Sequence, residues 1–119
     1  MYTSFTEMPV WQLAMDVAED IFLLTAPLPK KEDYGLTSQL RRAAVSIAAN
    51  LAEGFGRRGN KDKQKFYDYA RGSAFETQSH LLYGIRVHYF TEDACHTVLA
   101  KLNQIIHDIN KINKALGLD

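Results

Sequence analysis

The sequence predicts an all-α protein, an antiparallel up-down four-helix bundle that forms a single domain over residues 1–119. Apolar residues recur at helical spacing in four long segments, and the connections between these segments are short. No segment shows the alternating apolar and polar pattern of a strand. Long helices joined by short connections pack as antiparallel neighbours, and 119 residues correspond to one domain.

The first helix is expected over residues 9–25. Pro9 suits a first helical turn, where its missing N–H costs little, and Pro27 and Pro29 end the helix because proline disfavours helical geometry in the preceding residue. One row of apolar residues faces the core, and further apolar residues flank it. The row is Val10, Ala14, Val17, Ile21 and Leu24, and the flanking residues are Trp11, Leu13, Ala18 and Phe22. This face is wider than a single bundle needs.

The second helix is expected over residues 37–53, with Thr37 or Ser38 as its N-cap and Gly54 as its C-terminal cap. Its apolar row is Leu40, Ala44, Ile47, Leu51 and Phe55, with small neighbours Ala43, Ser46, Ala48, Ala49 and Ala52. Small side chains let another helix approach closely, so this helix is expected to be central.

The third helix is expected over residues 61–89. Its predicted inner face is Phe66, Tyr69, Ala70, Ser73, Thr77, Leu81 and Ile85, widened by Phe75, Leu82, Tyr83 and Tyr89. Gly72 lies in the middle of this helix, where glycine costs about 1 kcal/mol relative to alanine. We expect close packing of Gly72 against the alanines of the second helix to offset that cost.

The fourth helix is expected over residues 92–116, with Thr91 as its N-cap and Gly117 at its end. Glu92 and Asp93 suit the positive first turn of a helix. The apolar row is Ala94, Val98, Leu102, Ile105, Ile109, Ile112 and Leu116.

The composition excludes some classes of protein. Fourteen basic residues balance fourteen acidic residues, which argues against a generally basic nucleic-acid-binding protein. Cys95 is the single cysteine, so no intrachain disulfide can form, and a reducing compartment is expected. There is no signal-peptide pattern and no apolar run long enough to span a membrane. We therefore expect a cytoplasmic protein without a membrane partner.

Several motifs resemble one known family. They are QLRRAAVSIAANLAEGFGR (Gln39 to Arg57), ARGSAFE (Ala70 to Glu76), YGLTSQ (Tyr34 to Gln39) and the aromatic first helix around Trp11 and Ala14. These motifs resemble the four-helix-bundle proteins associated with 23S ribosomal RNA intervening sequences. The resemblance implies a ring-shaped homopentamer without catalytic residues. A related branch, the accessory protein of diversity-generating retroelements, binds nucleic acid and a reverse transcriptase through a basic ring. This chain differs from that branch because its net charge is near zero.

The motif positions that match include a polar set on two helices. Arg42, Ser46, Asn50 and Glu53 share one stripe of the second helix, while Gly72, Ser73 and Glu76 share one stripe of the third. Arg41 and Gly54 also match. One interpretation is a partly buried polar network of Arg42, Ser46, Asn50, Glu53 and Glu76 that fixes helix register or subunit contacts. The other is a ligand or RNA site.

The turn between the second and third helices carries a basic cluster. Gly54 to Gly59 spells G-x-G-x-x-G, but this pattern indicates a dinucleotide site only between a strand and a helix. Residues 41–65 carry a charge of +5, and residues 1–29 carry −4. The candidate nucleic-acid or anion-binding residues are Arg57, Arg58, Lys61, Lys63 and Lys65. The alternatives are a solvated turn, or attraction to the acidic first helix of a neighbouring subunit.

Metal and catalytic patterns are weak. The spacing of Asp93 and His96 would suit a metal ligand pair, but di-iron bundles need a second such pair. Glu76 and His80 face the same side of a helix, and Cys95 has no evident base. We expect no catalytic residue, no metal and no cofactor. Two functions remain. The first is a non-enzymatic homo-oligomer whose expected partners are further copies of the chain, and RNA or another nucleic-acid-handling protein. The second is a nucleic-acid-binding accessory protein that uses the basic turn.

Overall fold

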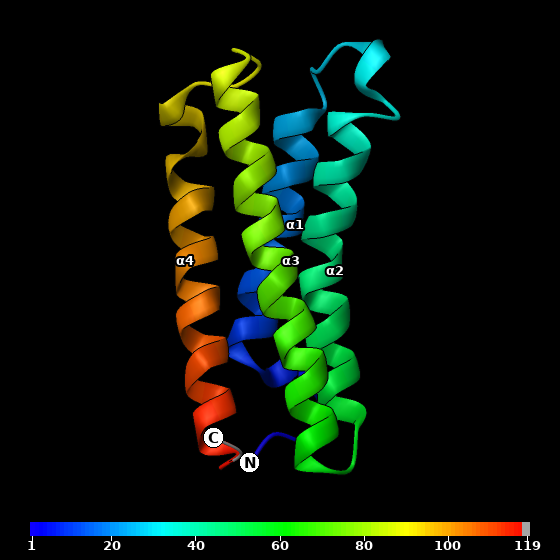
Figure 1. Cartoon of the computed structure of the whole chain (residues 1–119), viewed down its shortest axis with the longest axis vertical. Coiled ribbons are helices and arrows are strands. Elements are labelled where there is room, and N and C mark those ends of the chain that lie inside the picture. The colour runs from blue at the N-terminus through cyan, green and yellow to red at the C-terminus, as the bar shows by residue number, and fades with distance from the viewer. Residues whose placement is uncertain (118–119) are drawn as a thin grey trace.

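The computed structural model describes residues 1–117 and confirms the four-helix bundle. The helices are α1 (Pro9–Thr25), α2 (Leu36–Gly56), α3 (Asn60–Arg86) and α4 (Glu92–Ala115), with short 3-10 helices η1 (Phe5–Glu7) and η2 (Lys30–Glu32). They run alternately up and down a bundle of 43 × 22 × 22 Å (Figure 1). The N-terminus, the end of α4 and the α2–α3 turn lie at one end, called here the lower end.

Each helix packs against two neighbours around a shared core. α2 contacts α1 and α3, and α4 contacts α3 and α1, which closes the ring of four. The helices contribute apolar residues at helical spacing, and the largest fully buried side chains include Ile21, Leu40, Ile47, Leu51, Leu81, Leu102, Ile105 and Ile109. Each such side chain stabilises the fold by about 1.5–3 kcal/mol relative to an exposed one. The predicted apolar rows of α1, α2 and α4 therefore form the core or its edge, except that Ala94 is exposed and Cys95 is buried at the start of α4.

The start of α2 differs from the prediction. α2 begins at Leu36, and neither Thr37 nor Ser38 is the N-cap; Gly35 holds that position. Thr37 is buried, and its hydroxyl has no hydrogen-bond partner within residues 1–117. Instead, the Glu32 carboxylate accepts the Leu36 N–H at 3.0 Å and the Tyr89 hydroxyl at 2.9 Å. A side chain from η2 thus satisfies the first turn of α2.

The end of α2 also differs from the prediction. Gly54 is not a cap, because α2 continues to Gly56. Gly54 is buried, and a Cβ there would lie 2.6 Å from Cε1 of Tyr67. The Lys63 ammonium donates to the carbonyl oxygens of Phe55 at 2.7 Å and Gly54 at 3.4 Å. A lysine of α3 therefore supplies a donor to carbonyl groups in the last turn of α2, where intrahelical donors run out; the Gly54 carbonyl also accepts the Arg57 N–H at 3.2 Å.

The inner face of α3 is shifted from the prediction. The buried residues are Tyr67, Ala70, Ala74, Thr77, Leu81 and Gly84. Tyr69 is exposed, while Phe66, Ser73 and Ile85 are half-buried at the edges of the face. The predicted close packing of Gly72 is wrong, because Gly72 is exposed and a Cβ there would meet no atom within 4 Å. The close contacts with neighbouring side chains occur at Gly54 and Gly84 instead.

α3 ends earlier than predicted, at the connection between α3 and α4. α3 ends at Arg86, and His88 adopts a left-handed conformation with φ of 67°. The Gly84 carbonyl accepts the N–H groups of Tyr89 at 2.9 Å and Phe90 at 3.2 Å, which turns the chain away from the helix. The Thr91 hydroxyl then accepts the Ala94 N–H at 3.1 Å, which confirms Thr91 as the N-cap of α4. At the other end of α4, Gly117 has φ of 72°, as expected of a glycine that follows a helix.

Candidate functional site

The uncharged part of the predicted polar stripe joins α2 to α3. Ser46 and Asn50 on α2 and Ser73 on α3 are half-buried. The Ser73 hydroxyl donates to the Ser46 hydroxyl at 3.0 Å, and the Asn50 amide donates to the same oxygen at 3.0 Å. These three residues form one hydrogen-bonded cluster between the two helices.

The charged members of the stripe have separate partners. Glu53 pairs with Arg57 at 2.8 Å, and Glu76 pairs with His80 at 3.2 Å, each one turn along its own helix. Arg42 is exposed and enters no ion pair within residues 1–117. The structure therefore brings Ser46, Asn50 and Ser73 together, and it leaves the three charged groups unconnected to one another.

Arg42, Ser46 and Glu76 line a shallow, open groove of about 790 Å³ along α2 and α3. Val45 and Ala49 add apolar surface to the groove. The groove therefore presents an unpaired guanidinium, a carboxylate and apolar side chains together, which are groups that a protein or RNA partner can contact.

Arg41, the other motif arginine, has a structural position between α2 and α1. Its guanidinium donates to the Thr25 hydroxyl at 2.9 Å and lies 4.5 Å from the centre of the Phe22 ring. It also donates to the Phe22 carbonyl at 3.4 Å. Arg41 thus stabilises the C-terminal end of α1, because a cation near a helix C-terminus interacts favourably with the helix dipole.

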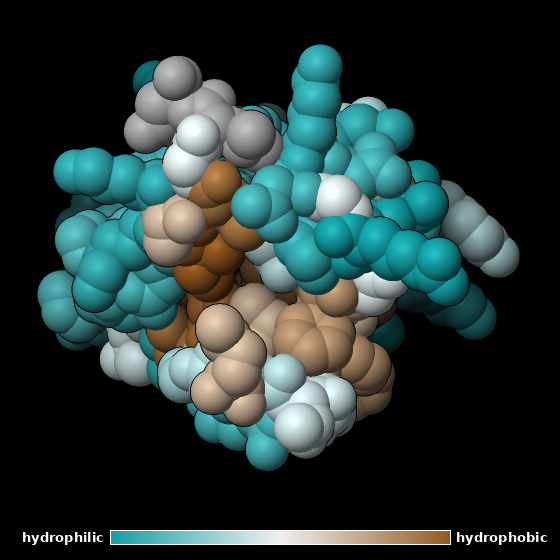
Figure 2. Space-filling model, turned by 90° about the horizontal axis from the view of Figure 1, so that it is seen from below, coloured by the Kyte–Doolittle hydropathy of each residue, from teal (hydrophilic) through white to brown (hydrophobic). Residues whose placement is uncertain are grey.

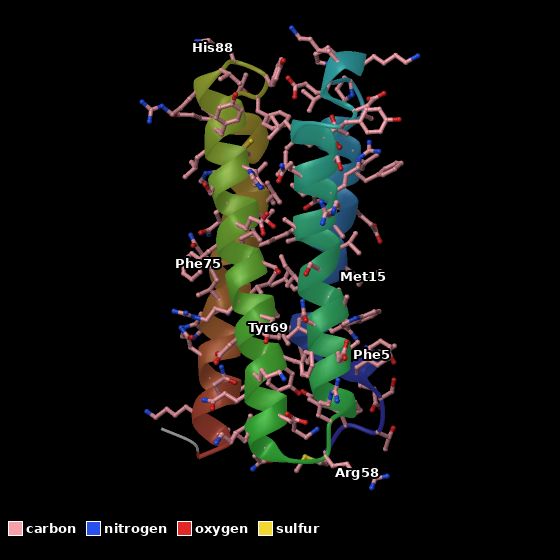
Figure 3. All side chains as sticks on the ribbon, turned by 45° about the vertical axis from the view of Figure 1, so that its right-hand side comes forward. Phe5, Met15, Arg58, Tyr69, Phe75 and His88 are labelled. Atoms are coloured by element: carbon pink, nitrogen blue, oxygen red, sulfur yellow. The ribbon has the colours of Figure 1, made fainter. Side chains whose placement is uncertain are left out.

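The basic cluster of the α2–α3 turn is partly committed to the fold. Arg57 pairs with Glu53 and lies 4.5 Å from the centre of the Phe66 ring, while Lys63 binds carbonyl groups of α2. Arg58 and Lys61 are exposed and enter no ion pair within the described residues. Arg58 lies at the lower end of the bundle (Figure 3). Exposed, unpaired positive charge at this turn therefore comes from Arg58 and Lys61, with Lys65 beside them over the Phe66 ring at 5.3 Å.

Large apolar side chains remain exposed on the outside of the bundle. On α3 they are Tyr69, Phe75, Leu82 and Tyr83, and on α1 they are Met15, Phe22 and Leu23. Exposed fractions reach 56% at Tyr83 and 69% at Leu23. Figure 3 shows Tyr69 and Phe75 along α3, with Met15 on α1. The predicted excess of apolar surface on these two helices is therefore present in the single chain.

Groups capable of catalysis or metal binding are sparse in residues 1–117. This part of the chain holds no group of three or more His, Cys, Asp or Glu side chains that suits a metal ion. Cys95 is fully buried, and burial raises the pKa of its thiol, which lowers its reactivity. His80 contacts Glu76 at an exposed site, and Asp93 and His96 are exposed on the first turns of α4. Within the same residues, no helix has the length and apolar character to cross a membrane.

The comparison that decides the family covers most of the chain. A family model described as "23S rRNA-intervening sequence protein" matches residues 6–111. The chain belongs to this family. The match contains Gln39 to Arg57 and Ala70 to Glu76, two of the motifs that carry the resemblance, and it includes α1, α2, α3 and most of α4.

A solved structure shares the fold of this family member. It is the crystal structure of a protein with unknown function from the S23 ribosomal protein family of Bacteroides thetaiotaomicron. The two chains are 21% identical with a TM-score of 0.79, over 88% of this chain and 98% of the other. At this identity the likeness establishes the fold alone. No match was found among curated proteins.

Two structural positions of this family member were not predicted from its sequence. The predicted inner face of α3 contains Phe66 and Tyr69 and leaves out Tyr67, because three aromatic residues lie close together there and spacing alone does not select the buried one. The sequence does not single out Lys111 as a site residue, because exposed lysines are common on helices. Both residues line a pocket at the lower end whose members are far apart in sequence. The sequence gives one indication of this pocket. The apolar periodicity of α4 continues through Ile112 to Leu116, near the end of the bundle.

Proposed function

We propose that this chain is a non-enzymatic assembly protein, a ring-like homo-oligomer of five subunits that acts through protein or RNA contacts. The observation that carries the proposal is the exposed apolar surface on α3, which is formed by Tyr69, Phe75, Leu82 and Tyr83. Phe75, Leu82 and Tyr83 line one surface groove, and clustered exposed apolar side chains mark interaction sites, because a monomer rarely leaves them in water.

A ring requires that one surface of a subunit meet a different surface of the next. α1 offers such a second surface through Phe22 and Leu23, and the acidic residues 1–29 complement the basic residues 41–65 in charge. Two unlike, complementary surfaces favour a closed ring over a two-fold dimer. The buried thiol of Cys95 supports the non-enzymatic part of the proposal.

The test is the solution mass measured by light scattering on a sizing column. We expect five times the mass of one chain. Leu82→Glu should shift the protein toward monomer, because a charge on the apolar surface of α3 opposes its burial. Asn110→Glu, at an exposed position of α4, is the matched control and should leave the mass unchanged. A wild-type protein that is monomeric at micromolar concentration would contradict the proposal.

A second candidate function is nucleic-acid binding at the α2–α3 turn, favoured by the exposed, unpaired side chains of Arg58 and Lys61. In a ring, these charges would be repeated around one end. We expect structured RNA to bind at low salt with an affinity that falls steeply as salt rises.

The variant for this candidate is Arg58→Ala with Lys61→Ala, which spares Arg57 and Lys63 because both support the fold. Its salt slope should fall by about one to two relative to wild type. Lys30→Ala with Lys31→Ala, at the opposite end of the bundle, is the control. Absence of binding at low salt, or equal slopes in the two double variants, would exclude the candidate.

A further inference from the structure

The lower end of the bundle contains an apolar pocket of about 810 Å³. Its apolar residues come from the start of α1, the end of α2 and the adjoining ends of α3 and α4. They include Met8, Val10, Phe55, Tyr67, Ile112 and Leu116. Figure 2, which views this end, shows the apolar surface in a hollow between hydrophilic side chains.

The pocket is open because the short helix at this end covers only half of the bundle. η1 contacts α1 and α2 and has no contacts with α3 or α4. The core therefore reaches the surface between α3 and α4. The volume of the pocket lies within the range of about 300–1,000 Å³ that is typical of small-molecule sites.

Tyr67 provides an unpaired polar group in this apolar surrounding. The residue is only 4% exposed, with its ring against Gly54. Its hydroxyl makes no hydrogen bond within residues 1–117 and is not one of the fully buried polar atoms, so it reaches the open pocket that Tyr67 lines. The hydroxyl is protonated at neutral pH, as tyrosine ordinarily is, and burial raises the pKa of Tyr67 further, so the group can donate a hydrogen bond to an acceptor.

Two lysines add positive charge around the pocket. Lys63 lies one turn before Tyr67 on α3, and its ammonium uses two of three N–H groups on the carbonyls of α2. Lys111 on α4 is exposed. Asp108 also lines the pocket, and one of its carboxylate oxygens accepts the Gln104 amide at 2.8 Å. With these three ionised groups and the Met1 residue that also lines it, the pocket carries an excess of positive charge, which favours an anion.

We propose that this pocket binds a small amphipathic carboxylate, with its hydrocarbon part against the apolar residues and its carboxylate at Lys63, Lys111 and the Tyr67 hydroxyl. The assignment is independent of assembly, because none of the exposed apolar residues of α1 and α3 lines the pocket.

Decanoate is the probe, and titration calorimetry with the whole chain measures its affinity. We expect decanoate to bind to Ile112, Leu116 and their neighbours, with amide chemical shifts changing at the lower end of the bundle. The neutral analogue 1-decanol should bind about tenfold more weakly, because it lacks the charge-assisted hydrogen bonds.

Three variants make the test specific. Lys111→Gln and Tyr67→Phe should each weaken decanoate binding about three- to tenfold, since each removes one hydrogen bond or charge at the carboxylate. Tyr67→Phe keeps the ring that packs on Gly54. Lys114→Gln, which removes an equal charge from α4 outside the pocket, should bind like wild type.

Absence of decanoate binding to the wild-type protein, equal affinity for decanol, or unchanged affinity in both pocket variants would each overturn the proposal. Solution mass is measured on the same samples. A protein that forms rings but ignores decanoate would refute this pocket assignment alone, and a monomer that binds decanoate would refute the assembly alone.

Discussion

Gly54 on α2 and Tyr67 on α3 are packed so closely that a Cβ at position 54 would come within 2.6 Å of the tyrosine ring. This contact lies at the lower end of the helix pair and beside the pocket. It explains why a glycine stands inside α2, where glycine otherwise costs about 1 kcal/mol relative to alanine. The same ring then forms part of the pocket wall.

Gly54→Ala should destabilise the protein by about 1–3 kcal/mol, because the added methyl group overlaps the Tyr67 ring. Gly72→Ala provides the opposite case, since Gly72 is exposed in the middle of α3 and has free space around its Cα. That variant should be more stable by about 0.5–1 kcal/mol. Urea denaturation measures both changes. Equal effects in the two variants would contradict the packing at Gly54.

His88→Gly should stabilise the protein by about 0.5 kcal/mol. A left-handed conformation costs a residue with a Cβ about 1–2 kcal/mol, and glycine avoids this cost. Part of the gain is lost, because glycine makes the unfolded chain more flexible and so increases the entropy cost of folding. His88 has φ of 67° in the turn between α3 and α4. His96→Gly, inside α4, makes the same exchange at helical geometry and should destabilise. The urea midpoints of the two variants should move in opposite directions.

The fold was predictable from sequence because periodicity alone decides which face of a helix is apolar. The starts of α1 and α4 agree with the prediction, and Pro9 and Thr91 have the predicted positions. α3 was harder, because Phe66, Tyr67 and Tyr69 are all aromatic and only the neighbouring helices decide that Tyr67 is buried.

The glycines and the candidate site show what sequence cannot supply. Gly54 meets a ring, Gly72 meets open space, and Gly117 has a positive φ, yet the residue type is the same. The difference depends on the partner helix. Likewise, the stripe of Ser46 and Asn50 followed from spacing, while its hydrogen bond to Ser73 depends on the rotation of α3.

Glu32 should make stability depend on pH in the acidic range. Hydrogen bonds from the Leu36 N–H and the Tyr89 hydroxyl lower the pKa of its carboxyl group in the folded state. A pKa lower in the folded than in the unfolded chain stabilises the fold above the unfolded value of about 4.3. This contribution is lost as the pH falls through the lowered folded pKa.

The check is the free energy of unfolding of Glu32→Gln relative to wild type, measured from neutral to acidic pH. The variant should be less stable at neutral pH, and the difference should shrink as the pH falls below about 4.3. Glu19→Gln, at an exposed position of α1, should show a difference that changes much less over this range. A Glu32→Gln difference that stays constant with pH would contradict the role of the carboxylate.

The hydrogen bond between Ser46 and Ser73 should couple α2 to α3 energetically. Ser46→Ala and Ser73→Ala should each cost about 1 kcal/mol, since each removes a half-buried hydrogen bond. In a double-mutant cycle, the two changes should show a coupling energy of about 0.5–1 kcal/mol. That result would give these motif residues a structural role in holding two helices in register.

The control cycle pairs Ser46→Ala with Ser79→Ala, an exposed serine on α3. These changes should be additive within about 0.3–0.5 kcal/mol, because the two side chains share no hydrogen bond. Additivity of Ser46→Ala with Ser73→Ala as well would mean that the inter-helix bond does not hold the register. Ser46 would then be available to a partner in the groove that it lines with Arg42 and Glu76, and weakened assembly or RNA binding in Ser46→Ala would locate that partner.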